Sequence, residues 1–284
     1  MTRELSFDGA PDLKRIYARA ALKRGTAGQT LPDVVARRGG VVLDADSLVD
    51  YARVCGFTVG STLPVTYPHL LAFPLQIALM SEPGFPLPLM GAVHTENVIT
   101  ALRPIRTDEV MDVTVRAENL RPHRRGRQVD VVSEVSAGGA PVWRGVSTYF
   151  SRGQEHPGAP RSEPPSLEAI SPVPEATWRM PEGVGRRYAA VSGDWNPIHV
   201  HALTARPLGF PTAIAHGMYT YARVMAHLAP KLPDSGLTSR VWFRKPLRLP
   251  SSVRVRSLVE DGHTLTVVEH VRGEIEHAIV ENTW

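Results

Sequence analysis

Cysteine is nearly absent from this sequence, in which Cys55 is the single example among 284 residues. One cysteine excludes both an intrachain disulfide framework and a zinc site built from cysteine thiolates. Small secreted proteins held together by disulfides are therefore excluded. The low cysteine content fits a reducing compartment, and we expect a cytoplasmic protein.

Long apolar runs are also lacking. The least charged region, 54–81, is interrupted by Pro64, Pro68 and Pro74, so no segment predicts a membrane span. Residues 1–26 do not contain the apolar core of a signal peptide. We therefore expect neither a cleaved leader nor a membrane span.

Several functional signatures are missing as well. The sequence has no Gly-rich phosphate loop, no dinucleotide fingerprint and no G-x-S-x-G nucleophile motif. Lys and Arg number 32 against 28 Asp and Glu, which gives a net charge of +4. This small excess forms no broad basic patch, and we expect no nucleic-acid partner.

Proline, in contrast, is abundant, with 25 residues, and seven of them fall within 151–181. This composition is typical of an extended, exposed linker. The length also favours about two domains of about 150 residues each. We expect an N-terminal extension with a short helix (1–40), a first domain (41–150), the linker (151–181) and a second domain (182–284).

The two halves of the chain resemble each other in three segments that keep their order and nearly keep their spacing. Three matches in register indicate an internal duplication. The matching segments are 51–56 with 188–193, 67–72 with 210–215, and 103–106 with 245–248.

Each half predicts one apolar helix followed by antiparallel strands, which is an α+β layout. The expected helices are Leu70–Met80 and Gly217–Leu228. The expected strands are His94–Leu102, Glu109–Asn119, Gln128–Ser136 and Val142–Phe150 in the first half, and Ser239–Arg244, Ser252–Val259, Thr264–Val271 and Ile275–Thr283 in the second.

The segment that carries chemistry is S-G-D-W-N-P-I-H at 192–199, followed by I-A-H-G-M at 214–218. Pro197 forces a turn between Asp194 and His199, so a carboxylate and an imidazole can meet over one site and share proton transfer. His216-Gly217 then opens a helix, whose first N–H groups have no partner within the helix and can hold an oxyanion.

Two other interpretations fit these residues. The segment can be an ordinary turn, in which Asp194 caps a helix and His199 is a loop histidine. It can also be a metal site, since Asp194, His199, His201 and His216 all carry ligand atoms.

The segments 192–199 and 209–218 together resemble the signature of the MaoC-like hydratases. These are the (R)-specific enoyl-thioester hydratases, also known as type-2 3-hydroxyacyl-thioester dehydratases. The segments 90–97 and 103–105 resemble the noncatalytic repeat of the two-domain, actinobacterial members. The resemblance implies a double hot dog, in which two antiparallel sheets each wrap round a long helix and form a pseudo-dimer within one chain.

The resemblance also implies roles for residues in the second half. In the hydration direction one of Asp194 and His199 takes the proton of water and the other delivers a proton to the α-carbon; the resemblance leaves the order open, and we favour Asp194 as the base. The implied catalytic pair is Asp194 and His199, the implied oxyanion donor is the N–H of Gly217, and the residues implied to shape the site are Ser192, Asn196 and His216. In the first half Phe73 and Pro74 take the places of His216 and Gly217. Because proline has no N–H, we expect no oxyanion hole there.

The implied substrate is a trans-2-enoyl or (R)-3-hydroxyacyl thioester of coenzyme A or of an acyl carrier protein, with no other cofactor and no metal. Arg124 and Arg125 lie in a basic run between two predicted strands, where they can form a hairpin turn or contact the phosphates of coenzyme A. A monomer and a homodimer both remain open. A hot-dog thioesterase and a non-enzymatic acyl-thioester-binding protein are the alternative functions.

Overall fold

A computed structural model of the chain describes residues 2–22 and 28–284. The chain divides into two compact units, of which the first comprises Met1–Ala45 and Ser61–Ser162. The second comprises Asp46–Gly60 and Glu163–Trp284. These bounds differ from the division expected from the sequence, because the segment 46–60 of the first repeat belongs to the second unit.

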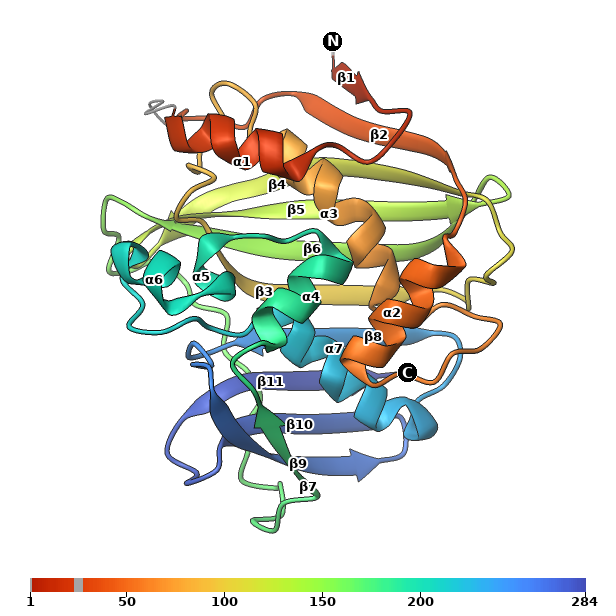
Figure 1. Ribbon diagram of the computed structural model, residues 1–284, viewed down its shortest axis with the longest axis vertical. Coiled ribbons are helices and arrows are strands. Elements are labelled where there is room, and N and C mark those ends of the chain that lie inside the picture. The colour runs from red at the N-terminus through yellow and green to blue at the C-terminus, as the bar shows by residue number, and fades with distance from the viewer. Residues whose placement is uncertain (1, 23–27) are drawn as a thin grey trace. The chain divides into compact units, whose positions relative to one another are not determined.

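The first unit contains a sheet in the strand order β1-β2-β4-β5-β6-β3. All neighbouring strands are antiparallel except β1, which runs parallel to β2. The helix α3 lies across this sheet and contacts β2, β4 and β5 (Figure 1). The strands are β1 (Arg3–Ser6), β2 (Val34–Val41), β3 (Val93–Ala101), β4 (Met111–His123), β5 (Gly126–Ala137) and β6 (Ala140–Arg152).

Alternation explains why β4 forms a half-buried strand. Met111, Val113 and Val115 are buried, whereas the intervening Asp112 and Thr114 are more accessible. Successive side chains of a strand point to opposite faces, so the apolar set faces the helix and the polar set faces away. The predicted strand is thereby confirmed, with ends that differ by a few residues.

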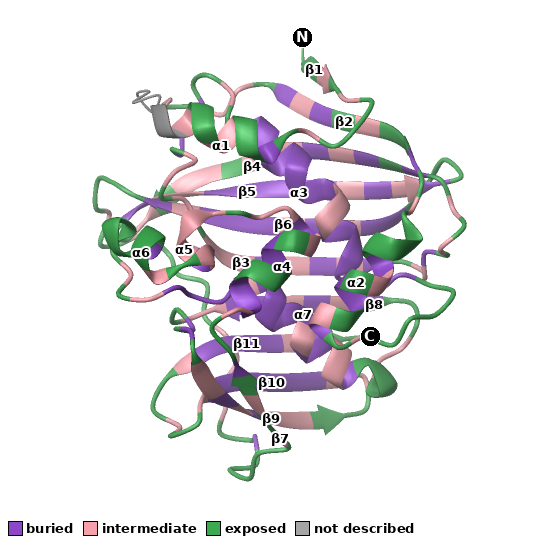
Figure 2. Cartoon of the chain, in the orientation of Figure 1, coloured by how far each residue is buried: buried purple, intermediate pink, exposed green. Residues whose placement is uncertain are grey.

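The helix α3 (Tyr67–Met80) is buried along almost its whole length (Figure 2). It begins at Tyr67, three residues before the expected start, and Pro68 fits because the first helical turn needs no N–H donor. Pro74 therefore lies inside the helix, as in the predicted range, whereas its counterpart Gly217 is the first residue of a helix.

The second unit contains a sheet in the order β8-β11-β10-β9-β7, with antiparallel neighbours throughout. The helix α7 (Gly217–Leu228) has the predicted bounds and contacts β11. The strands are β7 (Ala176–Met180), β8 (Leu237–Phe243), β9 (Ser251–Glu260), β10 (His263–His270) and β11 (Glu276–Thr283), and the other helical segments are α2 (Ala45–Cys55), α4 (Val184–Ser192), α5 (Pro197–Val200), α6 (Ala202–Ala205), η1 (Arg206–Leu208) and η2 (Ala229–Lys231).

The N-terminal region is part of the first unit and not a separate appendage. The short helix expected in this region, over 13–24, is present as α1 (Leu13–Leu22), and residues 23–24 lie outside the described residues. The strands β1 and β2 were not predicted, and they extend the first sheet beyond β4. Within residues 2–22 and 28–284, no helix has the length and apolar character needed to cross a membrane.

The proline-rich linker is not exposed throughout, in contrast to the expectation. Ile170 is only 4% exposed and packs with four buried residues of the second sheet. Those residues lie on β8, β10 and β11, and they are Trp242, Leu265, Val267 and Ile279. The linker also contributes β7, which pairs with β9.

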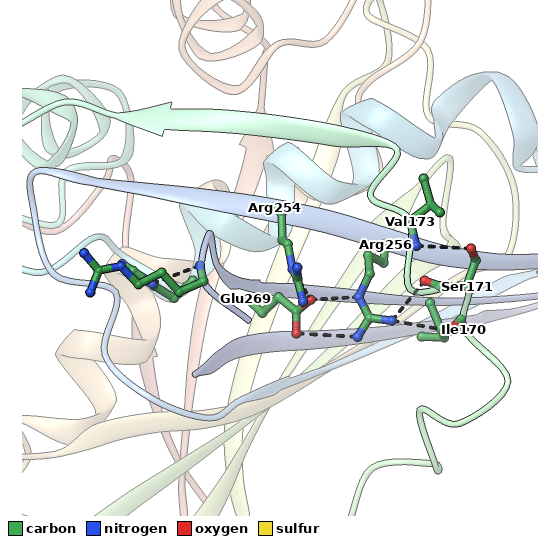
Figure 3. Close-up of polar contacts among 8 residues, drawn as sticks. Ile170, Ser171, Val173, Arg254, Arg256 and Glu269 are labelled. Atoms are coloured by element: carbon green, nitrogen blue, oxygen red, sulfur yellow. Dashed lines mark hydrogen bonds and ion pairs between the residues drawn. The ribbon is translucent and has the colours of Figure 1, made fainter. Parts of the chain in front are cut away.

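A buried ion cluster fastens the linker to the second sheet (Figure 3). Glu269, whose side chain is 4% exposed, accepts hydrogen bonds from Arg254 at 2.6 Å and Arg256 at 2.7 Å. Burial by itself raises the pKa of Glu269, but the two arginines outweigh this effect and leave the pKa below its ordinary value. Arg256 also donates to the backbone carbonyls of Ile170 and Ser171, at 3.3 and 3.0 Å.

The interior of the first unit contains a polar stack of aromatic rings. His94 stacks on Tyr149, with ring centroids 4.8 Å apart, and His69 lies 6.0 Å from His94. The hydroxyl of Tyr149 donates to Gln76 Oε1 at 2.9 Å. Burial lowers the pKa of His69 to about 4, and burial together with the charge of His69 lowers that of His94 to about 3.

We expect Arg256→Met to loosen the linker. Glu269 keeps Arg254, but the two linker carbonyls lose their donor, and we expect the free energy of unfolding to fall by about 2 kcal/mol. Urea unfolding measures this fall, and cleavage by a Glu-specific protease at Glu168 should become faster. Arg179→Met, at an exposed position on β7, is the control. Equal stability and equal cleavage rates in both variants would contradict the prediction.

Acid should destabilise the first unit. The unfolded chain binds a proton on His69 near pH 6.5, whereas the folded protein resists this protonation down to about pH 4. The stabilisation is therefore complete above pH 6.5 and is lost as the pH falls, with about 2 kcal/mol lost at about pH 5 for His69 alone. Urea unfolding at neutral pH and at about pH 5 should show a smaller loss in His69→Phe than in His156→Gln. The same loss in both variants would count against a role for His69.

Candidate active site

The catalytic motif begins where α4 ends. Gly193 terminates α4 in the left-handed conformation, with φ of 75°, which glycine adopts without steric cost. The chain then turns, and Asn196 caps α5 by accepting a hydrogen bond from the N–H of Ile198 at 3.3 Å. Pro197 occupies the first turn of α5, where its fixed φ is favourable.

Asp194 is held in this turn by its neighbours. Its N–H donates to Ser192 Oγ at 3.2 Å, and its carboxylate oxygen Oδ1 accepts from the N–H of Asn196 at 3.2 Å. Ser192 and Asn196 thus both contact Asp194, and their roles in shaping the site stay a prediction. The side chain of Asp194 stays partly accessible, at 21%.

His199 lies on α5 and is 8% exposed. Its Nδ1 is 2.8 Å from the backbone carbonyl oxygen of Ile214. A carbonyl oxygen only accepts, so Nδ1 carries a proton and Nε2 of the neutral ring presents a lone pair. Gly185 of α4 packs so closely on the carbonyl of His199 that a Cβ would clash with it.

The start of α7 lies beside this pair. The ring of His216 stacks on that of His199, with centroids 3.7 Å apart and planes 26° apart. His216 Nε2 is 2.9 Å from the backbone carbonyl of Asp194. Gly217 is the first residue of α7, and a Cβ there would lie 2.9 Å from the ring of Phe243. Only glycine therefore fits without displacing that ring.

The structure brings together three of the four residues considered as metal ligands. One ligand atom from each of Asp194, His199 and His216 lies within 4.8 Å of the others. Because the two imidazole planes are nearly parallel, their in-plane lone pairs do not converge on one ion, and this geometry disfavours a shared metal. His201 is elsewhere, where it caps α6 by accepting from the N–H of Leu203.

Burial sets the electrostatics of the two histidines. It lowers the pKa of His199, while the carboxylate of Asp194 and the hydrogen bond to Ile214 raise it in part. Burial also lowers the pKa of His216 to well below its ordinary value, an effect that a positive charge on His199 strengthens. Both rings are therefore neutral at neutral pH in the resting protein.

This arrangement is suited to moving protons on and off a small oxygen species. Three atoms no more than 4.8 Å apart can each reach a common point at about 2.8 Å, which is a hydrogen-bond distance. A carboxylate and an imidazole can thus contact the same water or hydroxyl group, next to the unpaired N–H groups of a helix start.

Two supporting features were not predicted from the sequence. The Ile214 carbonyl that sets the tautomer of His199 is a backbone group, for which no side-chain signal exists. Tyr188 of α4 packs against His216, with ring centroids 4.9 Å apart. The sequence did single out Tyr188, because it is the counterpart of Tyr51 in the internal duplication.

Arg124 and Arg125 form the turn between β4 and β5, as the hairpin interpretation predicts. Arg124 Nε donates to the carbonyl of Pro157 at 3.3 Å. Both arginines belong to the first unit, whereas Asp194 and His199 belong to the second. A contact with coenzyme A phosphates stays a prediction.

Known proteins resemble this chain in sequence and in fold. The MaoC like domain matches residues 167–280. The chain is 42% identical over 220 residues to 3-hydroxyacyl-thioester dehydratase X of Mycobacterium tuberculosis, which covers 78% of each protein. It is 33% identical over 79 residues to an (R)-specific enoyl-CoA hydratase of Rhodospirillum rubrum. This match covers 28% of this chain and 53% of that protein.

Among solved structures, the crystal structure of HtdX from Mycobacterium tuberculosis has a TM-score of 0.77 and 36% identity to this chain. The match covers 87% of this chain and 98% of the HtdX chain. The likeness therefore extends over both units and is not limited to the segment that carries the motif.

The coupling between Asp194 and His199 can be measured directly. Asp194→Asn removes the charge that raises the pKa of His199, so we expect this pKa to fall below its wild-type value. NMR titration of histidine-labelled protein, with His199→Gln for assignment, measures the change. Asp234→Asn, at an exposed position in the same unit, should leave the titration unchanged. An unaltered His199 titration in Asp194→Asn would show that the two groups are not coupled.

Proposed function

The chain belongs to the MaoC-like dehydratase family, and on that premise we propose that it catalyses the reversible hydration of trans-2-enoyl thioesters to (R)-3-hydroxyacyl thioesters. The expected fold class, an α+β double hot dog, is confirmed by the likeness to HtdX. The enzyme is accordingly a hydro-lyase, in agreement with the names of its relatives.

One observation carries the assignment of the catalytic residues. Asp194 and His199 meet beside the first turn of α7, and each is fixed by hydrogen bonds to the backbone or to adjacent side chains. A fixed carboxylate–imidazole pair next to unpaired N–H groups supplies an acid, a base and an oxyanion donor at one place.

Hydration requires the pair to enter the reaction with one transferable proton. In the resting site His199 is neutral, with its proton on Nδ1, so Nε2 takes up this additional proton from solvent, beside the carboxylate of Asp194, before the reaction begins. The carboxylate of Asp194 accepts a proton from water as the water oxygen attacks the β-carbon. Protonated His199 donates its Nε2 proton to the α-carbon, because its Nδ1 proton is held by the Ile214 carbonyl. The pair ends with one proton on Asp194, and dehydration follows the same path in reverse.

The thioester carbonyl gains negative charge while water adds to the conjugated double bond. The N–H of Gly217, at the positive end of α7, is placed to donate a hydrogen bond to that oxygen. A single such donor is worth about 3 kcal/mol of transition-state stabilisation in other enzymes. The absence of a side chain at Gly217 allows close approach of the substrate.

The remaining features of the function follow the same proposal. The substrate carries its own coenzyme A or carrier-protein group, and the chemistry needs no further cofactor or metal. The single, buried Cys55 is compatible with work in the cytoplasm. An acyl carrier protein as partner, and a homodimer in place of a monomer, are both compatible with the fold.

Hydration of a short trans-2-enoyl-CoA tests the function, with chiral analysis of the product. We expect the (R)-3-hydroxyacyl product, and we expect Asp194→Asn to lower kcat by about 10²–10⁴-fold because the base is lost. Asp234→Asn serves as the matched control and should keep the wild-type rate. The corresponding carrier-protein thioester is tested in parallel.

Three results would contradict the proposal. Full activity in Asp194→Asn would remove the assigned base. Release of free thiol from acyl-CoA, without hydration, would indicate a thioesterase. Binding of enoyl thioesters of both carriers without any turnover would indicate an acyl-thioester-binding protein.

A further inference from the structure

His216 contacts every functional group of the proposed site. Its Nε2 lies 2.9 Å from the backbone carbonyl of Asp194 and 3.7 Å from the carboxylate oxygen Oδ2 of the same residue. Its ring stacks on His199 at 3.7 Å between centroids. Its backbone forms the N-cap of α7, directly before Gly217.

The hydrogen bond to Asp194 fixes the chemical form of His216. A backbone carbonyl can only accept, so Nε2 carries the proton, and the neutral ring leaves Nδ1 as an acceptor. Nδ1 is buried and has no hydrogen-bond partner among the described residues. His216 therefore holds Asp194 as a donor, while its neutral ring adds no charge beside His199.

The opposite side of His216 is supported by aromatic residues. Tyr188 packs against its ring at 4.9 Å, and Tyr51 of α2 lies 6.4 Å from Tyr188. His216 is 2% exposed within this packing. The ring of His216 thus has little room to move, and its contacts restrain Asp194 and His199 in turn.

We propose that His216 is a positioning residue that clamps the main chain of Asp194 and stacks on His199, so that the acid–base pair keeps its alignment with the N–H of Gly217. This role rests on the proposed hydration reaction, and it assigns to His216 no contact with substrate. A small displacement of an acid–base group is costly, because proton transfer requires hydrogen-bond distances between the reacting atoms.

An apolar residue in place of His216 would avoid the unpaired Nδ1, but it would also leave the backbone carbonyl of Asp194 without the N–H that it accepts from. The choice of a polar ring in this interior is explained by the N–H that it supplies to Asp194. Glutamine also supplies an N–H at the end of a side chain of similar length, whereas phenylalanine supplies only the flat ring. These two substitutions therefore separate the hydrogen bond from the packing.

The test compares His216→Gln with His216→Phe in the full chain, with a short trans-2-enoyl-CoA as substrate. We expect His216→Phe to lose about 10–100-fold in kcat with little change in KM, since a misplacement of about 1 Å has effects of this size. We expect His216→Gln to keep kcat within about fivefold of wild type, because the clamp is retained. Equal losses in both variants would overturn the proposal, as would a wild-type rate in His216→Phe.

A second measurement does not depend on turnover. His216 is neutral, so its removal takes away no charge, and a change in the His199 titration reports movement of Asp194. We expect the pKa of His199 to fall in His216→Phe, as in Asp194→Asn, and to stay at the wild-type value in His216→Gln. If wild type turns over enoyl thioesters of neither carrier, the proposed function fails, and this titration alone decides the role of His216.

Thermal unfolding of each variant guards against a purely structural explanation. His216→Leu, which is smaller than phenylalanine and also lacks a donor, replaces His216→Phe if the latter does not fold. The proposal would be overturned if the loss of activity in each variant matched the fall in its unfolding midpoint and if His216→Gln were no more active than His216→Phe.

Discussion

Two hydrogen bonds from imidazole rings to backbone carbonyls hold the site together. His199 donates to Ile214 in a buried environment, and His216 donates to Asp194 in a partly buried one. Each bond decides which ring nitrogen carries the proton, and burial keeps both rings neutral. The direction of proton transfer, the stacking of the rings and the distance to the start of α7 all depend on these two bonds.

The two repeats have kept a common layout while their interiors have diverged. Each unit has an antiparallel sheet and a central helix, α3 or α7. Around α3 several buried polar groups bond to one another, as when Tyr149 donates to Gln76 and Gln76 donates to Ser133. Around the start of α7 the polar groups are arranged toward a site. The first unit thus uses buried polarity for packing, and the second uses it for chemistry.

Much of the fold was predictable because its signals are local. The bounds of α7 were predicted because an apolar helix follows a glycine, and β4 was predicted from alternation. The strands β1, β2 and β7 were missed, since each is defined by pairing with distant residues: β1 and β7 are short edge strands, and β2 pairs with β1 on one side and β4 on the other. The start of α3 was placed too late, after Pro68, although the first turn of the helix accommodates this proline.

The site shows the same division between local and distant information. Asp194 and His199 were predictable because a proline turn joins them within a few residues. The contact of His216 with Asp194 spans 22 residues and involves a main-chain oxygen, which leaves no mark on the sequence. The association of α2 with the second unit also depends on tertiary packing alone.

The membership of α2 in the second unit has a consequence for where such a chain can be cut. The proline-rich linker looks like the natural place to divide the chain. A cut there would separate Tyr51 from Tyr188 and remove α2 from the second unit. During synthesis α2 leaves the ribosome long before the rest of the second unit, so it can pack there only after residues 163–284 have been made. The second unit is therefore built from residues of both copies of the repeat.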